Sequence, residues 1–355
     1  MSDRVEWVTD PRRFAAVEAC WDRLASGPFD RHAWYSAWWG AFANGRRLAV
    51  CLLWRDESLV AALPLCRSRG RLEAMANFHS PQFEPLAQSR DALESVMKAA
   101  LDASGGELRL TPVPSAGDAF GVCLEACEQA GRLVVVGAQH TSPVTDTSGE
   151  FSTWRSARKD ALRELERRRR KLARDHDPVI RLIDRPENLE RELTRGLEVE
   201  GSGWKGRQGT AIVSSPETLA FYGSLARAFH GTGELVLSSI ALEDRVVAFD
   251  LALLQGGRYW LLKTGFDERA RSLAPGLVLR HHVIERCFEL GLAAHEFLGD
   301  SMPWKLPFAT GERAHAQILA FRRRPDSLLR YSLRRLPRGR MAQAYRRLRA
   351  SRPAR

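Results

Sequence analysis

The sequence predicts an α/β (α+β) protein with two tandem domains, each a mixed, largely antiparallel sheet flanked by helices. Three observations support this fold class. A chain of 355 residues exceeds the size that one hydrophobic core usually reaches, so two domains are expected. Helical and strand patterns alternate through the chain. In the second half, three strand-like runs are separated only by tight turns, which predicts an antiparallel meander.

In the first half, a helical pattern over 10–45 carries aromatic residues that we expect in the core: Trp34, Tyr35, Trp38, Trp39 and Phe42. Strands and helices alternate after it. The expected strands cover 47–54, 58–67, 107–113 and 132–137, and the expected helices cover 91–103 and 118–130. Residues 141–150 have the composition of a loop.

The second half begins after a long charged helix that we expect over 152–175. Its expected strands cover 179–184, 234–242, 246–254, 258–266, 293–299 and 315–321, and its helices cover 187–203, 216–229 and 276–290. The predicted domains are 1–148, a basic helical connector over 149–177, a second domain over 178–324, and an Arg-rich tail over 325–355.

The net charge of +11 is concentrated in two segments. Residues 322–355 hold 13 arginines and one acidic residue, and residues 155–174 hold ten basic residues against three acidic ones. The rest of the chain is mildly acidic. Clustered positive charge favours a polyanionic partner such as RNA, an anionic membrane or a phosphate-rich cofactor. The alternative is a solvated helix face followed by a loose tail.

Several classes of protein are disfavoured. No apolar run is long enough for a membrane span, and the N-terminal sequence lacks the apolar core of a signal peptide, so we expect a soluble, cytoplasmic protein. The six cysteines form no Cys-x-x-Cys pair, which predicts reduced thiols and no metal. No nucleophile elbow, P-loop or dinucleotide fingerprint occurs, so covalent-nucleophile catalysis is unsupported.

The start of the helix at Gly276 is a candidate anion site. Unpaired backbone N–H groups and the helix dipole converge at such a start. Pro275 needs no N–H partner there, and Gly276 allows a ligand to approach the backbone closely. We expect Ser272, Pro275, Gly276 and Leu277 to form this anion site.

Seven short motifs in the second half resemble one known family. They are Glu200–Gly206, Gly209–Ile212, Ala248–Asp250, Lys263–Phe266, Ser272–Gly276, Glu296–Asp300 and Trp304–Lys305. Together they are similar to the CelD-like bacterial acyltransferases of the GNAT superfamily, which are related to the FemABX aminoacyl transferases. The resemblance covers about 150–325 and implies tandem GNAT-like domains. It also implies a donor, acyl-CoA or aminoacyl-tRNA, whose pyrophosphate or phosphates lie at the helix start.

The chain departs from the family pattern in two places. The superfamily's glycine-rich loop before the helix is absent, because from Arg271 the first glycine is Gly276. Relatives often carry Tyr-Lys at the position of Trp304-Lys305. The first departure, together with the basic connector, leans toward a bulky anionic donor.

Two carboxylates are candidates for the catalytic base. A two-residue turn at Gly256-Gly257 would place Asp250 directly opposite Lys263, where Asp250 could deprotonate an amine and Lys263 could hold an anion or tune Asp250. The alternative for this pair is a buried ion pair. Asp300 follows the strand expected beside the acyl site and is the second candidate base, with a loop cap as its alternative.

Four further residues are candidate substrate contacts. Trp204 could offer a flat wall and Lys205 a cation for a phosphate or carboxylate, and Trp304 and Lys305 are their counterparts in the last motif. The alternative is a packed tryptophan beside a solvated loop lysine. His281 and His282 are expected in core or surface positions.

The sequence thus predicts an N-acyltransferase that moves an acyl or aminoacyl group to a small-molecule or peptide amine by direct attack. The Arg-rich tail over 325–355 mixes leucines with arginines and is expected to contact tRNA or the inner face of an anionic membrane peripherally. The alternative function is a non-catalytic GNAT-fold module that binds RNA or an anionic membrane through its Arg-rich segments.

Overall fold

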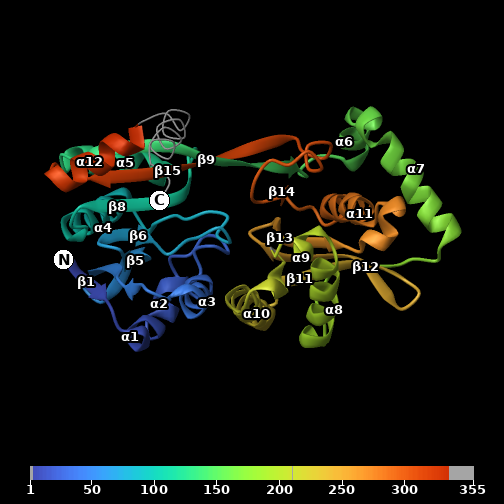
Figure 1. Cartoon of the computed structure of the whole chain (residues 1–355), viewed down its shortest axis with the longest axis horizontal. Coiled ribbons are helices and arrows are strands. Elements are labelled where there is room, and N and C mark those ends of the chain that lie inside the picture. Colours follow the sequence, from blue (N-terminus) through green and yellow to red (C-terminus); the bar gives the residue numbers. More distant parts are fainter. Residues whose placement is uncertain (1–2, 210, 336–355) are drawn as a thin grey trace, which may run out of the picture.

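A computed structural model describes residues 3–209 and 211–335 of the chain. Two lobes lie side by side along the long axis of Figure 1, and two long strands join them across one edge. Within the described ranges, none of the helices combines the length and the apolar character of a bilayer span.

The first lobe contains a four-stranded antiparallel sheet in the order β1–β3–β4–β7, beside one end of a larger sheet. Its helices are α1 (Pro11–Ala15), α2 (Glu18–Asp22), α3 (His32–Phe42), α4 (Arg90–Ala103) and α5 (Asp118–Gln129). Its strands are β1 (Asp3–Val8), β2 (Arg47–Leu48), β3 (Val50–Arg55), β4 (Ser58–Leu63), β5 (Leu65–Ser68), β6 (Arg71–Ala74), β7 (Leu86–Ala87) and β8 (Glu107–Pro114).

The second lobe surrounds the other end of the larger sheet. Its strands are β10 (Val179–Asp184), β11 (Leu235–Leu242), β12 (Arg245–Gln255), β13 (Arg258–Phe266) and β14 (Ala294–Glu296). Its helices are α8 (Leu189–Ser202), α9 (Trp204–Arg207), α10 (Pro216–Gly231) and α11 (Pro275–Glu289), with 3₁₀ turns η1 (Ile212–Ser214) and η2 (Glu268–Leu273). Figure 1 shows α8 and α10 on one side of this sheet and α11 on the other.

Two strands make one sheet of the two lobes. They are β9 (Leu133–Asp146) and β15 (Gly311–Phe321), and the strand order is β10-β11-β12-β13-β14-β9-β15-β8-β6-β5-β2. β15 pairs antiparallel with both β9 and β8, although it follows them by more than 160 residues. Because β15 from the second half pairs with β8 and β9 from the first, the large sheet does not divide at the predicted domain limits. The limits at 148, 177 and 324 stay predictions.

Three further helices follow the two long strands in the chain, α6 (Phe151–Ala157) and α7 (Lys159–Asp175) after β9 and α12 (Pro325–Arg335) after β15. The single helix expected over 152–175 is therefore interrupted at Arg158. On α7, Arg169 contacts both His281 Nδ1 and Glu285 of α11 at 3.0 Å, which ties the basic helix to the second lobe. His281 is fully buried, as a core position requires.

The predicted fold class is confirmed, and the meander is its clearest part. β11, β12 and β13 pair antiparallel, and Gln255 lies opposite Arg258 across the Gly256-Gly257 turn. Both turn glycines have positive φ, 59° and 66°, as a two-residue hairpin turn of this kind requires. The helix expected at 276–290 forms as α11, and Gly291 follows its C-cap with φ of 64°.

The first lobe differs from expectation at two points. The helix expected over 10–45 is three helices, preceded by a strand, β1, that the sequence pattern did not indicate. The loop expected over 141–150 instead continues β9 to Asp146, because β14 and β15 offer it backbone partners from distant parts of the chain. The aromatic residues expected in the core do pack there, with Trp34, Tyr35 and Trp38 almost fully buried.

The lobes contact each other through α3 and α10. The rings of Trp34 and Phe221 pack edge to face with centroids 5.3 Å apart, and Phe29 meets Trp260 at the same distance. Arg31 and Glu234 form an ion pair of 3.1 Å across the same boundary. Near this apolar contact, the first-lobe loop that contains His79 also lies against α10.

We predict that Gly196→Ala destabilises the second lobe. A Cβ at this α8 position would overlap the ring of Phe249, and forcing the overlap costs about 1–3 kcal/mol. Gly40→Ala in α3 is the matched control, because its Cβ would meet nothing within 4 Å and alanine favours the helix. Urea unfolding measures both. Equal or greater stability of Gly196→Ala would contradict the packing described.

Candidate active site

Asp250 does not lie opposite Lys263. Asp250 pairs with Thr264 and Lys263 pairs with Leu251, because a bulge after Leu251 shifts the register between β12 and β13. Directly opposed residues share a face of a sheet, and a shift by one residue reverses the face. Asp250 therefore faces α11, whereas Lys263 faces α8 and α10. The predicted Asp250–Lys263 pair is wrong.

Asp250 belongs instead to a buried network between the sheet and α11. Its carboxylate is 0% exposed and lies 2.6 Å from Nη2 of Arg280. Nη1 of Arg280 donates to Nε2 of His295 at 2.8 Å. Burial and the neighbouring guanidinium hold the pKa of His295 well below its usual range, so the imidazole is neutral and accepts this hydrogen bond. Asp250 is therefore in a buried ion pair, but with Arg280 rather than with Lys263, and its role as a base stays a prediction.

On the opposite face, Lys263 meets residues from both lobes. Its Nζ lies 4.9 Å from the centroid of the Tyr222 ring on α10. His79, in a loop of the first lobe, lies 3.4 Å from the Tyr222 hydroxyl through Nδ1 and 3.4 Å from Thr218 Oγ1 through Nε2. Burial, and secondarily the positive charge of Lys263, lower the pKa of His79 to about 4.

Two glycines permit close backbone contacts of the Glu200–Gly206 motif, one with β13 and one within the motif. A Cβ on Gly265 would lie 2.7 Å from Cα of Glu200, so only glycine lets the end of α8 rest on the strand. A Cβ on Gly206 would overlap the carbonyl of Gly201. Glu200 is almost fully buried, and its carboxylate accepts from the backbone N–H of Ile212 at 2.8 Å. This carboxylate therefore stabilises the turn that leads into η1.

Trp204 and Lys205 lie on the short helix α9 rather than in the loop that was expected. The side chains of both residues, and the whole of Thr210, lie outside the described part of the chain. Their predicted substrate contacts stay predictions.

The start of α11 lies where the sheet opens. β13 and β14 run parallel and pair over only three residues, from Arg258 with Ala294 to Trp260 with Glu296. β13 then continues to Phe266 without β14 at its side. Because the carboxyl ends of parallel neighbours meet at the same edge, Lys263, the segment after Glu296 and the start of α11 lie together at this edge.

Not every backbone N–H group at this helix start is available to a ligand. Ala274 has φ of 49° and precedes Pro275, which has no N–H, and Leu277 donates its N–H to the Ala274 carbonyl at 3.0 Å. Gly276 packs closely on Phe266, since a Cβ there would lie 3.4 Å from that side chain. Ser272 is exposed and Leu277 is partly exposed. Phosphate binding by these four residues stays a prediction.

A groove of about 400 Å³ lies on the α8 side of the sheet, where β12 begins and β13 ends, and its lining includes no residue of β13, β14 or α11. It lies between the end of α8, the β11–β12 turn and the first residues after β13, and it is lined by Val199, Ser202, Arg245, Asp267 and Arg269 among others. Its volume is in the range of small-molecule sites. Charged side chains of both signs line it, which suits a polar ligand.

The last motif forms a compact turn. Leu298 and Gly299 both have positive φ, and the carbonyls of Leu298 and Asp300 each accept from Nζ of Lys305 at 2.6 Å. Lys305 is only 5% exposed, so its ammonium holds the turn together. Trp304 is partly exposed and packs on Phe297 with ring centroids 5.9 Å apart. Asp300 is exposed at this turn, and its role as a base stays a prediction.

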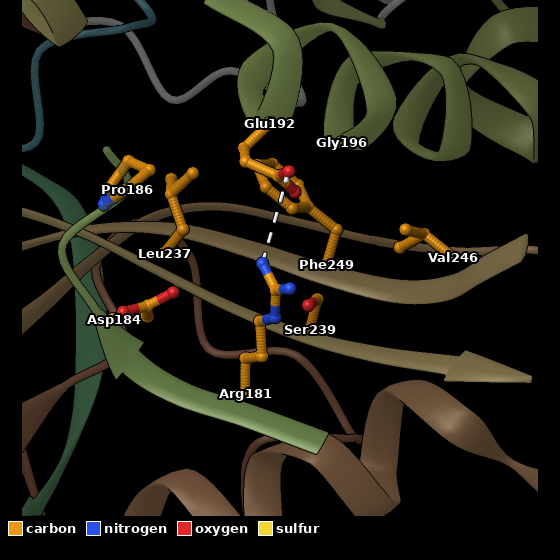
Figure 2. A pocket seen from close by; sticks show the side chains of 9 residues that line it. All are labelled: Arg181, Asp184, Pro186, Glu192, Gly196, Leu237, Ser239, Val246 and Phe249. Atoms are coloured by element: carbon orange, nitrogen blue, oxygen red, sulfur yellow. Dashed lines mark ion pairs between the residues drawn. The ribbon is translucent and has the colours of Figure 1, made fainter. Parts of the chain in front are cut away.

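A second, smaller cavity lies away from this edge, between β10, β11, β12 and α8 (Figure 2). In Figure 2, Arg181 of β10 points across it toward Glu192 of α8, and the closest atoms are 4.0 Å apart. Its volume of about 20 Å³ holds a water molecule and is too small for an acyl donor.

Sequence reasoning missed His79 and Tyr222. Both lie far from the motifs in sequence, and His79 comes from the other half of the chain, so no spacing rule connects them to Lys263. An available signal was the composition of the loop around Phe78-His79, which places two aromatic side chains in a segment with no helical or strand pattern. Phe78 is 88% exposed beside the site.

Comparisons with known proteins agree with this architecture. Residues 159–306 match the family described as "Acetyltransferase (GNAT) domain". The solved structure of FemX superposes with a TM-score of 0.59 at 11% identity, covering 92% of this chain and 100% of FemX. L-PGS from Bacillus licheniformis gives a TM-score of 0.56 at 12% identity, covering 92% of this chain and 96% of that one.

A third structure is similar over almost its whole length. It is the C-terminal domain (DUF2156) of an Agrobacterium fabrum protein named a lysylphosphatidylglycerol synthetase, with a TM-score of 0.56 at 11% identity, covering 89% of this chain and 95% of that one. At these identities the likeness shows a shared fold. No curated protein sequence matches this chain.

We predict that Asp250→Ala unfolds the second lobe easily, because it leaves the Arg280 guanidinium buried without its ion pair. The expected loss is about 3–5 kcal/mol in the free energy of unfolding, measured with urea. The double variant Asp250→Ala with Arg280→Met removes both charges and should recover part of this loss. An Asp250→Asn variant of unchanged stability that loses all transfer activity would instead restore Asp250 as the base.

We predict that His79 titrates near pH 4 and that Lys263→Met raises this midpoint toward 6.5. Because the folded-state pKa is lowered, the unfolded chain binds the proton more strongly between pH 6.5 and 4. His79 therefore costs stability as the pH falls through this window. NMR titration of the His79 ring, assigned with His79→Gln, measures the midpoint. An unchanged midpoint in Lys263→Met would show that the two side chains are not neighbours in solution.

Proposed function

We propose, on the premise that residues 159–306 are a GNAT acetyltransferase domain, that this chain is an N-acyltransferase that works at the opened edge of the β13–β14 sheet. The observation that carries the proposal is the separation of β13 from β14 after three residue pairs, with α11 beginning shortly after the end of β13. An acyl group could enter between the strands there while the donor's phosphates rest near Gly276.

The reaction proposed is direct attack. The nitrogen of an amine attacks the acyl carbonyl carbon, a C–N bond forms, and the bond from that carbon to the donor's sulfur or oxygen breaks. The amine loses a proton, which a carboxylate accepts, and the leaving group takes up a proton. Since Asp250 is held by Arg280, the exposed carboxylate of Asp300 is the base in this proposal. Most of the rate enhancement would come from positioning.

Lys263 and Tyr222 would form the acceptor side of the site. Tyr222 contacts both Lys263 and His79, so an acceptor bound at Lys263 would also lie near the loop of Phe78 and His79. An ammonium at Lys263 suits an acceptor that carries a carboxylate or phosphate near its amine.

Two donors fit the chemistry, a thioester of coenzyme A and an aminoacyl ester of tRNA. The helix start favours the second. Pro275 carries no N–H and Leu277 donates its own to Ala274, which leaves Gly276 as the backbone donor of this turn among the residues described. The resemblance to FemABX proteins implies the same donor. The amine acceptor is a small molecule or peptide in either case.

The test offers the purified full-length chain both donors, acetyl-CoA and a mixture of charged tRNAs, with a panel of amines bearing an acidic group. We predict amide formation from one donor, and at least about a hundredfold lower kcat for Asp300→Asn with normal folding. The matched control is Asp175→Asn, an exposed carboxylate on the last residue of α7 that no candidate role involves. Transfer that is unchanged in Asp300→Asn would remove this base, and no transfer from either donor would favour the non-catalytic alternative.

A further inference from the structure

The last described helix, α12, is fixed to the first lobe by one face. Ser327 is fully buried, and its hydroxyl donates to the carbonyl of Gly106 at 3.2 Å. The ring of Tyr331 lies 6.0 Å from that of Phe321 on β15. Just before the helix, the Arg322 and Arg323 guanidiniums donate to carbonyls of Asp102 and Gly131. The helix is thus held against the sheet in one orientation.

The other face of α12 exposes three leucines. Leu328, Leu329 and Leu333 are 43%, 64% and 45% exposed. At about 100° per residue they fall within roughly 140° of the helix circumference, on the side away from Ser327 and Tyr331. A contiguous apolar face of this kind on an otherwise charged helix indicates a surface that a partner covers.

Arginines surround these leucines. Residues 322–335 hold six arginines and one acidic residue, Asp326, and the sequence that follows to 355 holds seven arginines and no acidic residue. Arg330 lies 3.7 Å from Glu107, a buried carboxylate of β8. Arg324 and Arg334 are also exposed. The face therefore combines apolar side chains with a strong excess of positive charge.

We propose that α12 and the arginines around it form a docking surface for an anionic phospholipid bilayer. The exposed leucines would enter the boundary between headgroups and acyl chains, and the guanidiniums would contact lipid phosphates. RNA would be held by the same arginines, but phosphate contacts do not use leucines, so the apolar face favours a membrane.

This surface lies at the far end of the molecule from the candidate active site. In Figure 1, α12 lies beside α5 at the outer end of the first lobe, and α11 lies in the second lobe. A bilayer that covered α12 would leave the edge of β13 and β14 open to its substrates. The proposal does not depend on which donor the site uses, or on whether the site is active.

The test measures how the full-length protein cosediments with vesicles. We expect binding to phosphatidylcholine vesicles that contain phosphatidylglycerol, and much weaker binding to phosphatidylcholine alone. The double variant Leu328→Ser with Leu329→Ser should bind the anionic vesicles at least about tenfold more weakly, because it removes apolar surface without changing charge. Leu290→Ser, an equally simple change at an exposed leucine after α11, should bind like the unaltered protein.

Circular dichroism and thermal unfolding verify that each variant is folded, which is expected because the leucines are exposed. Two results would overturn the proposal. One is equal vesicle binding by the double variant and the unaltered protein. The other is salt-sensitive binding to a homopolymer RNA with no binding to anionic vesicles, which would make the arginines a nucleic-acid surface instead.

Discussion

The ion pair between Asp250 and Arg280 constrains the rest of the second lobe. Removing two charges from water costs several kcal/mol for each ion, and only close geometry with further hydrogen bonds offsets it. Here Arg280 also donates to His295, so one side chain of α11 is bound to two strands, β12 and β14. The helix cannot slide or rotate without breaking this network. The first turn of α11, near the place where β13 and β14 separate, is therefore held in position by Arg280, which lies about one turn further along the helix.

The local elements of this lobe could be predicted from sequence, whereas the register could not. Turn glycines at 256 and 257, alternating apolar residues and the Gly291 stop carry their information within a few residues, and the meander and α11 were both confirmed. The bulge that separates Asp250 from Lys263 has no such signature. It moves one strand by one residue, which leaves the alternation pattern intact on both sides while it reverses the face of every side chain beyond it.

The residues that the contact between the lobes brings together could not be predicted from sequence either. The position of His79 beside Tyr222 depends on how α3 packs on α10, through Trp34 and Phe221. Each aromatic residue could be assigned to a core, but nothing in the chain indicates that the two cores meet. The motifs were more informative. Gly265 and Gly206 both belong to motifs that the sequence singled out, and both permit close backbone contacts in the structure. Lys305 was a candidate substrate contact, and in the structure its ammonium donates to the carbonyls of Leu298 and Asp300.

The pairing of β15 with β8 and β9 bears on how the protein is made. Ala320 lies opposite Leu108, so the sheet of the first lobe is completed by residues synthesised more than 200 positions later. While the ribosome is still translating the second lobe, the exposed edges of β8 and β9 have no native neighbour in the slot of β15, and unpaired strand edges are prone to aggregate. A nascent chain of this architecture needs either a temporary cover for that slot or rapid completion of its C-terminal strand. Gene fragments that encode the first lobe alone would inherit the same gap.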